Sequence, residues 1–264
     1  MLIAHLSDTH ICDPGIATCG HVPMADHLGR CVVSINALEP APDLVVLSGD
    51  VTDKAMRSSA QHAAKILSAL TMPLFVVPGN HDDRQVLAEV FGPHIFPTTD
   101  DGLANYSIDG FPLRIIGLDT LNPGKPGGRL GPASLDWLEA RLKDGGAQPT
   151  LLVAHHPPLN LGVPETDDDG FEGTERLASL VRAYPNIERF LCGHIHLHTH
   201  TRWCGTVVTT APSIGMQLTL DLTQTKPSQF LLSDPAYLLH HWTPGQTLTT
   251  HQITLNSLEG PFDF

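Results

Sequence analysis

Five short segments of the chain carry residue types that commonly bind metal ions. In chain order they are Asp8-Thr9-His10, Gly49-Asp50, Gly79-Asn80-His81-Asp82, His155-His156 and Gly193-His194-Ile195-His196. Imidazole, carboxylate and amide oxygen together suit Mn, Fe, Co or Zn, and the set holds more histidine than Mg or Ca sites use. Seven candidate donors exceed the four that one tetrahedral ion needs, so the motifs predict two ions.

Two metal ions at one site have a defined chemistry at phosphorus. They usually lie roughly 3.5–4 Å apart and stabilise both oxygens of an in-line displacement. Two divalent ions outweigh the carboxylates of Asp8 and Asp50 together with one bridging hydroxide, so the centre stays positive and accepts a phosphodiester monoanion. A bound water with a lowered pKa supplies the nucleophile near neutral pH.

Each motif follows a short apolar run that is typical of a buried strand. The runs are Leu2–Leu6, Leu44–Leu47, Leu74–Val77, Leu151–Ala154 and Phe190–Cys192. In open α/β sheets, ligands bind in the crevice at the carboxyl ends of strands. Five strand ends therefore bring the motif side chains to one place.

Helical patterns alternate with these strands and predict an α/β class. Apolar residues recur near helical spacing in 26–38, 58–70, 84–91, 132–142 and 174–181. Segments 103–108 and 112–119, joined at Asp109-Gly110, predict a β-hairpin. Residues 124–131 are rich in Gly and Pro and predict an ordinary loop.

The pattern changes after Thr210. Short strand-like runs follow, separated by Pro and Gly, at 216–222, 229–233, 236–242 and 247–255. We therefore expect a catalytic part over 1–211 and a β-rich C-terminal segment over 212–264. This segment would complete a sandwich or form a dimer or cap surface.

Composition limits the partners. The chain has 264 residues and a formal charge of −13, which argues against stable binding to nucleic acid or to an anionic membrane. No apolar run approaches a membrane span, and no signal peptide fits before the first strand. Five unevenly spaced cysteines predict reduced thiols, so we expect a cytoplasmic protein.

The ordered motifs D-x-H, G-D, G-N-H-D, H-H-P and G-H-x-H resemble those of the calcineurin-like metallophosphoesterases, and they span residues 8–196. The chain is also similar to one branch of that family, the class III cyclic nucleotide phosphodiesterases and glycerophosphodiesterases. The features that carry this resemblance are the short chain, H-H-P-P at 155–158, and Pro212-Ser213 followed by Gln217. This resemblance implies a four-layer αββα sandwich of two mixed sheets flanked by helices.

The resemblance also implies a role for each motif residue. It assigns Asp8, His10 and His196 to one metal. It assigns Asn80, His155 and His194 to the other, with Asp50 as the bridge. His81, with Asn80 beside it, is similar to the residue that contacts the substrate phosphate, and it would protonate the leaving group.

Two segments depart from the protein phosphatase branch of the family. That branch carries G-D-x-V-D-R-G and G-N-H-E, whereas residues 49–54 here are G-D-V-T-D-K and residues 79–82 are G-N-H-D. The departures disfavour a Ser/Thr protein phosphatase. Asp53 stands where that branch has an acid directed at the motif histidine, so we expect an Asp53–His81 hydrogen bond that orients the ring.

Other motif residues have ordinary structural explanations when taken singly. Asp8 could be a turn residue and Asp50 a helix cap, because Asp favours both. His156 could ligate in place of His155, although the family pattern favours His155 and leaves His156 behind it.

Two further features near the motifs are expected to lie outside the metal site. His198 and His200 continue an alternation of histidines, and we favour the surface over a third metal for them. The run Asp167-Asp168-Asp169 predicts a solvated loop, with a substrate lid as the alternative.

The sequence therefore predicts a binuclear metal-dependent phosphodiesterase. Its substrates would be small diesters, such as 3',5'-cyclic nucleotides or glycerophosphodiesters, cleaved by a metal-bridging hydroxide that attacks phosphorus. A phosphomonoesterase of the same fold and a non-catalytic binding scaffold are the alternatives, and the complete ligand set disfavours the scaffold. The family also suggests a homodimer or higher homo-oligomer formed through the C-terminal region.

Overall fold

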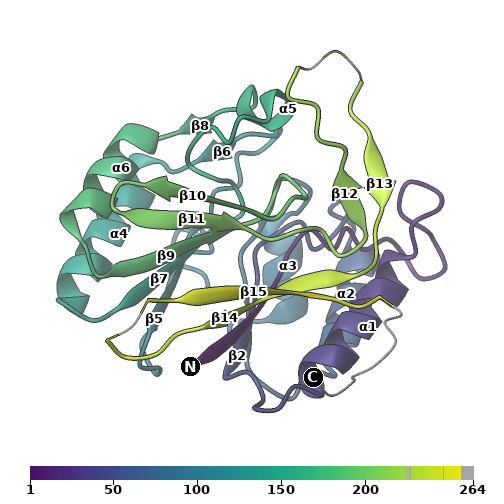
Figure 1. Cartoon of the computed structure of the whole chain (residues 1–264), viewed down its shortest axis with the longest axis horizontal. Coiled ribbons are helices and arrows are strands. Elements are labelled where there is room, and N and C mark those ends of the chain that lie inside the picture. Colours follow the sequence, from purple (N-terminus) through teal and green to yellow (C-terminus); the bar gives the residue numbers. More distant parts are fainter. Residues whose placement is uncertain (224, 226, 246, 257–264) are drawn as a thin grey trace, which may run out of the picture.

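The first sheet contains the strands that precede the first three motifs. The computed structural model describes residues 1–223, 225, 227–245 and 247–256. The strand order of this sheet is β15 (Thr249–Thr254), β14 (Ala236–His241), β1 (Leu2–Leu6), β2 (Leu44–Leu47) and β3 (Leu74–Val76). β1, β2 and β3 run parallel, whereas β14 and β15 add antiparallel. The C-terminal segment therefore extends this sheet beyond β1 (Figure 1).

The second sheet contains the strands that precede the last two motifs. Its order is β10 (Thr199–Trp203), β11 (Thr206–Thr210), β9 (Ile187–Cys192), β7 (Thr150–Val153), β5 (Arg114–Gly117) and β4 (Tyr106–Ile108). The four inner strands are parallel, and β10 and β4 pair antiparallel at the two edges. The predicted hairpin around Asp109-Gly110 is confirmed as the β4–β5 pair.

Five helices cover the outer faces of the sheets. They are α1 (Met24–Asn36), α2 (Arg57–Leu67), α3 (Arg84–Phe91), α4 (Pro132–Gly145) and α6 (Thr174–Ala183). The carboxylate of Asp83 accepts the Val86 N–H at the start of α3, and Pro132 occupies the first turn of α4. The predicted helices are confirmed, with ends that differ from the sequence pattern by a few residues.

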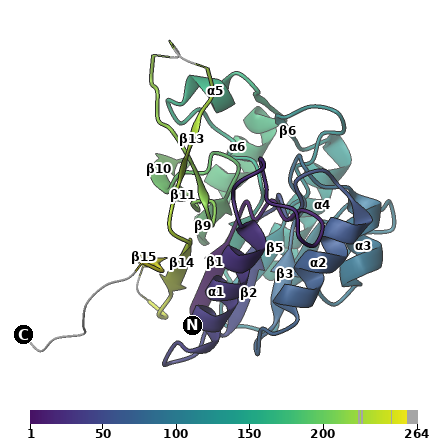
Figure 2. The ribbon, with the colours of Figure 1, turned by 90° about the vertical axis from the view of Figure 1, so that its right-hand side faces the viewer.

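Alternating side chains divide the interior into three apolar layers. Ala4 and Leu6 of β1 pack in a cluster with residues of α1, α2 and α3. Ile3, on the opposite face of β1, packs in a second cluster with Ile115 and Leu151 of the other sheet. A third cluster joins that sheet to α4 and α6. The predicted four-layer αββα sandwich is therefore confirmed. Figure 1 shows α1–α3 on one side of it and α4 and α6 on the other, and Figure 2 looks onto the side that carries α1–α3.

Several short elements lie beyond the carboxyl ends of the central strands. β6 (Gly128–Arg129) pairs in parallel with β8 (Phe171–Glu172), and α5 (Pro164–Asp167) precedes β8. β12 (Met216–Leu218) and β13 (Phe230–Leu232) form an antiparallel ribbon that rises beside α5 in Figure 1. The prediction of an ordinary loop over residues 124–131 is therefore only partly right, because residues 128 and 129 form β6 and pair with β8.

The boundary between 1–211 and 212–264 stays a prediction. Residues 257–264 of the expected C-terminal segment lie outside the described residues. Within the described ranges, no helix is long and apolar enough to cross a membrane.

Candidate metal centre

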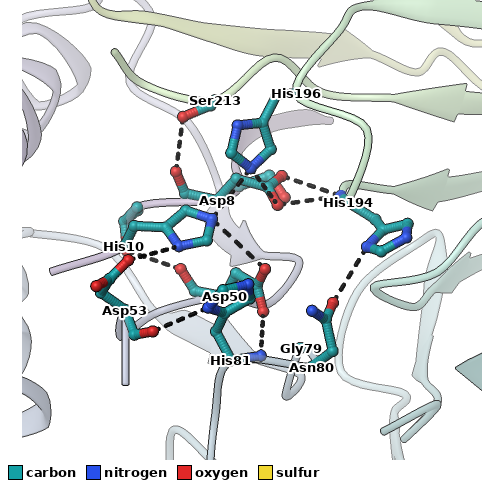
Figure 3. A network of polar contacts seen from close by, with 12 residues as sticks. Asp8, His10, Asp50, Asp53, Gly79, Asn80, His81, His194, His196 and Ser213 are labelled. Carbon is teal, nitrogen blue, oxygen red and sulfur yellow. Dashed lines mark hydrogen bonds and ion pairs between the residues drawn. The ribbon is translucent and has the colours of Figure 1, made fainter. Parts of the chain in front are cut away.

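The motif residues leave their strands in an unusual backbone conformation. Positive φ angles occur at Asp8 (52°), His10 (40°), Asp50 (48°), His194 (72°) and His196 (53°). A non-glycine residue in this region costs on the order of 1 kcal/mol, and such strain concentrates at functional sites. These sharp turns direct side chains from both sheets into one space (Figure 3).

The first group of donors contains Asp8, His10 and His196. The Nε2 atoms of His10 and His196 lie 3.0 Å apart. Nε2 of His196 lies 3.5 Å from Oδ1 of Asp8. These residues come from the ends of β1 and β9, so the first group joins the two sheets.

The second group contains Asn80, His155 and His194. Oδ1 of Asn80 lies 3.1 Å from Nε2 of His155 and 3.1 Å from Nδ1 of His194. Oδ2 of Asp50 lies 3.4 Å from His155 Nε2 and 3.5 Å from His10 Nε2. Asp50 therefore stands between the two groups, where a bridging ligand would stand.

The spacing of these donors fits metal ions. An ion about 2.1 Å from each ligand would place neighbouring ligands roughly 3.0–3.4 Å apart in tetrahedral or octahedral geometry. Every donor pair above lies within 3.0–3.5 Å. The side chains present thus suit two metal ions.

The remaining ring nitrogens of the four histidines face oxygen atoms of the protein. Nδ1 of His155 donates to the Ser48 carbonyl at 2.7 Å, and Nδ1 of His196 donates to the Met216 carbonyl at 2.7 Å. Nδ1 of His10 lies 3.6 Å from Oδ1 of Asp53. Such outer contacts fix which nitrogen faces an ion.

The C-terminal segment supplies two of the contacts that support the first group. One is the Met216 carbonyl on His196. The other is the Ser213 hydroxyl, which donates to the main-chain carbonyl of Asp8 at 2.8 Å. Residues beyond position 211 therefore hold the centre in place.

The charges of the site favour cations. Burial would raise the pKa of Asp50, but His155, His10 and His81 hold it well below its usual range. Burial would lower the pKa of His155, but the Asp50 carboxylate raises it to about 9. The pKa of His194 falls to about 3, through burial and the charge of His155. The Asp50 carboxylate thus retains a proton on His155, and a metal ion would displace that proton.

Asp82 is a functional residue that sequence reasoning left without a role. Its buried carboxylate accepts the N–H groups of Val51, Thr52 and Gly79 at 2.9–3.1 Å. It therefore ties the Asp50 turn to the Asn80 turn. Gly79 permits this approach, because a Cβ there would lie 2.4 Å from the Asp50 nitrogen. The sequence signal for this role was the aspartate at the end of the G-N-H-D motif.

His81 is held differently from our expectation. Its Nδ1 donates to the main-chain carbonyl of Asp53 at 2.8 Å, while the Asp53 carboxylate faces His10. The expected Asp53–His81 hydrogen bond is present, but the side chain of Asp53 does not make it. The His81 N–H also donates to Oδ1 of Asp50 at 2.8 Å, which leaves Oδ2 for metal ions.

The choice between His155 and His156 follows from their partners. His156 lies close enough to His155 and His194 to join a metal-binding group. Its two ring nitrogens, however, contact Thr120 Oγ1 at 2.8 Å and the Pro126 carbonyl at 2.9 Å. Both ring nitrogens of His156 thus have partners of their own, whereas Nε2 of His155 faces Asn80 and Asp50.

His198 and His200 lie apart from the centre. Both are exposed, and Nδ1 of His198 contacts Oε1 of Gln252 at 2.9 Å. β10 begins only at Thr199, so the four histidines do not alternate along one strand as the pattern suggested. Their expected surface location is confirmed.

A cavity of about 360 Å³ opens over the donors. Glu165 and Asp169 line one wall, and Met216, Leu218 and Phe230 line another. No Lys or Arg is among the described residues that line it. The space suits a small molecule, and positive charge would come only from histidines and bound ions.

Residues 1–198 match the family of calcineurin-like phosphoesterases. The chain belongs to this family. It is 36% identical to a probable glycerophosphodiester phosphodiesterase GpdQ of Arcobacter nitrofigilis, over 100% of this chain and 97% of that protein. It is 31% identical to the 3',5'-cyclic adenosine monophosphate phosphodiesterase CpdA of Escherichia coli K12, over 66% of this chain and 62% of that protein.

A solved structure shows the same fold. A dimetal phosphatase from Danio rerio aligns with a TM-score of 0.65 and 17% identity, over 97% of this chain and 99% of that one. Family membership confirms the resemblance that the motifs predicted. It also agrees with the candidate histidine and aspartate groups at the strand ends.

Proposed function

We propose that this calcineurin-like phosphoesterase is a phosphodiesterase that uses two metal ions to hydrolyse small diesters. The position of Asp50 carries the proposal, since one carboxylate oxygen lies 3.4–3.5 Å from a histidine of each donor group. Relatives that match along almost their whole length are named glycerophosphodiester phosphodiesterases.

Each group of residues would bind one of the two ions. Asp8, His10 and His196 would hold one ion, and Asn80, His155 and His194 the other, with Asp50 shared between them. When bound, the ions would lower the pKa of water and neutralise charge on the phosphate. Asn80 lies at the cavity wall beside His81, where it can contact both its ion and the substrate.

His81 is the proposed proton donor. Its Nδ1–H is fixed on the Asp53 carbonyl, so an added proton would sit on Nε2. The side chain is exposed and lines the cavity. From there, Nε2 can protonate the leaving alcohol as the P–O bond breaks, the usual task of a general acid.

Glycerophosphodiesters are our first choice of substrate. The relatives named for this activity align with 99–100% of the chain, whereas the cyclic nucleotide enzyme aligns with 66%. The C-terminal residues of the cavity wall, Met216, Leu218 and Phe230, lie beyond the family match at 1–198. A substrate that contacts this wall depends on the part of the chain that the glycerophosphodiesterases share.

Three further expectations belong to this proposal. The native metals are Mn, Fe, Zn or Co. Five free cysteines support a reducing compartment such as the cytoplasm. The exposed side chains of Leu220, Leu222, Leu231 and Leu232, at and beyond the β12–β13 ribbon, support a homodimer through the C-terminal region.

A substrate panel after Mn or Zn loading tests the proposal. Glycerophosphodiesters, cyclic nucleotides, bis(p-nitrophenyl) phosphate and p-nitrophenyl phosphate should be compared by kcat/KM. We expect diesters to exceed the monoester, with glycerophosphodiesters above cyclic nucleotides. A clear preference for p-nitrophenyl phosphate would replace the proposal with a phosphomonoesterase of the same fold.

A further inference from the structure

One of the four metal-binding histidines has its outer partner on a surface segment. His194 directs Nδ1 toward Asn80, so Nε2 is the nitrogen remote from the second donor group. Nε2 lies 3.8 Å from Oδ2 of Asp169. By contrast, His155 and His196 donate to main-chain carbonyls at 2.7 Å. The His194 ring is therefore the one whose orientation depends on the segment that contains Asp169.

The chemistry of ligation gives this contact a role. A neutral histidine that binds an ion through Nδ1 must carry its proton on Nε2, and that proton faces Asp169. A carboxylate in this position fixes the tautomer and increases the basicity of the ligand. At 3.8 Å the two atoms are too far apart for a hydrogen bond, and a movement of about 1 Å would form one.

The position of Asp169 is set by the packing of its segment. A Cβ on Gly127 would lie 2.0 Å from the Asp169 carbonyl oxygen, so only glycine permits this approach. The adjacent Gly128 N–H donates to the Gly170 carbonyl at 3.1 Å and begins the β6–β8 ladder. Asp169 is thus held against β6, and its side chain is 27% exposed.

The three carboxylates of the acidic run have different surroundings. Asp167 accepts the N–H groups of Leu161 and Gly162 at 2.8 and 2.9 Å and so shapes its own loop. Asp168 and Asp169 are both exposed to solvent, and Asp169 also lines the cavity. The expected solvated loop therefore holds for Asp168 and Asp169, and Asp169 in addition forms part of the cavity wall.

We propose that Asp169 is a positioning residue that orients His194 and thereby strengthens binding of the second ion. The inference rests on the proposed two-ion centre. It makes the segment 164–172 part of the metal site, because any shift of this segment changes the support of His194. Among the described residues of this wall, Asp169 rather than Glu165 is the carboxylate beside Nε2 of His194, so Glu165 separates positioning from simple negative charge.

Mn²⁺ binding to the full chain tests this inference. Isothermal titration should give two affinities for the unchanged protein, and the spectrum of an exchange-coupled Mn pair should appear with the second ion. We expect Asp169→Asn to weaken the second affinity by about 10–100-fold and to delay the coupled spectrum. The first affinity and the melting temperature in chelator should stay unchanged. His194→Ala identifies which affinity belongs to the second group.

Matched variants decide between the explanations. Glu165→Gln removes the same charge from the same wall and should leave both affinities intact, while Asp169→Glu should restore part of the loss. Equal weakening by Glu165→Gln, or no weakening by Asp169→Asn, would overturn the positioning role alone. If the unchanged protein takes up only one Mn²⁺, the two-ion centre itself is wrong.

Discussion

Two buried clusters of histidine differ in their neighbours. At the metal centre, Asp50 stands beside His155 and raises its pKa to about 9. Between β1 and β14, His5 contacts His240, and burial together with the charge of His198 lowers the pKa of His5 to about 3. The nearby carboxylate, rather than the number of histidines, makes a buried cluster suited to cations.

The ring nitrogens of the His5 cluster all have hydrogen-bond partners that carry no charge. One chain of hydrogen bonds can run from Thr250 to His240 at 2.9 Å, to His5 at 3.2 Å and to Ser48 at 2.8 Å, and Ser48 then donates to Ser7 at 2.7 Å. In this arrangement each imidazole accepts one hydrogen bond and donates one, as a neutral ring does. The clusters meet at Ser48, whose carbonyl accepts from His155.

Removing the Asp50 carboxylate should have the largest effect on activity of the changes considered. Asp50→Ala takes a ligand from both donor groups and leaves histidines like those of the His5 cluster. Because metal-ion catalysis contributes several kcal/mol, we expect kcat/KM for a diester to fall by about 10³-fold or more. Steady-state kinetics in excess Mn measures the loss, and Asp168→Asn, an exposed charge change, is the control. A fall of less than about tenfold would contradict the bridging role.

His81 lies beside the carboxylates but is proposed to donate a proton rather than to bind an ion. A change at His81 therefore tests proton transfer separately from metal binding. His81→Ala should keep its metal and slow a diester with a poor leaving group by about 10²–10⁴-fold. A p-nitrophenyl ester needs little protonation and should lose less. Equal losses on both substrates would assign His81 to phosphate binding instead.

The raised pKa of His155 makes metal uptake depend on pH. Below about 9 the ring is protonated in the protein without metal, so an ion must displace that proton. Apparent affinity should therefore fall by up to about tenfold for each pH unit below that value. Titration in buffers of different ionisation enthalpy counts the released protons. Affinity that is constant from pH 6 to 8 would show that His155 is already neutral.

The lowered pKa of His5 should make the stability of the folded chain depend on pH. Its folded pKa, about 3, lies below the ordinary value of 6.5, so the unfolded chain binds the extra proton between these values. Stability is full above pH 6.5 and should fall by about 1.4 kcal/mol for each pH unit below it, for this one histidine. His5→Gln should flatten the slope. Urea unfolding in chelator at pH 7 and pH 5.5 measures it, and identical slopes would reject the neutral ring.

Sequence reasoning located the fold and the donors because each depends on local patterns. Apolar runs that end in Asp8, Asp50 and Asn80 marked strand ends, and strand ends of parallel sheets meet. The helix α3 was predicted at its observed bounds, since Arg84 follows the N-cap Asp83 and Gly92 follows the last residue, Phe91.

Sequence reasoning missed the residues that act through distant contacts. The role of Asp82 depends on three N–H groups from two turns. The partner of Asp169 lies in the last motif, and the His5–His240 pair joins residues 235 positions apart. No local pattern carries such information, because these pairs exist only after the sheets assemble.

The metal content of the active protein tests the two-ion centre most directly. Chain stripped of metal should be titrated with Mn²⁺ while activity on bis(p-nitrophenyl) phosphate is followed, and bound Mn determined by elemental analysis. With Asp50 between two donor groups, activity should rise until about two ions are bound per chain. Full activity at one ion per chain would contradict the account.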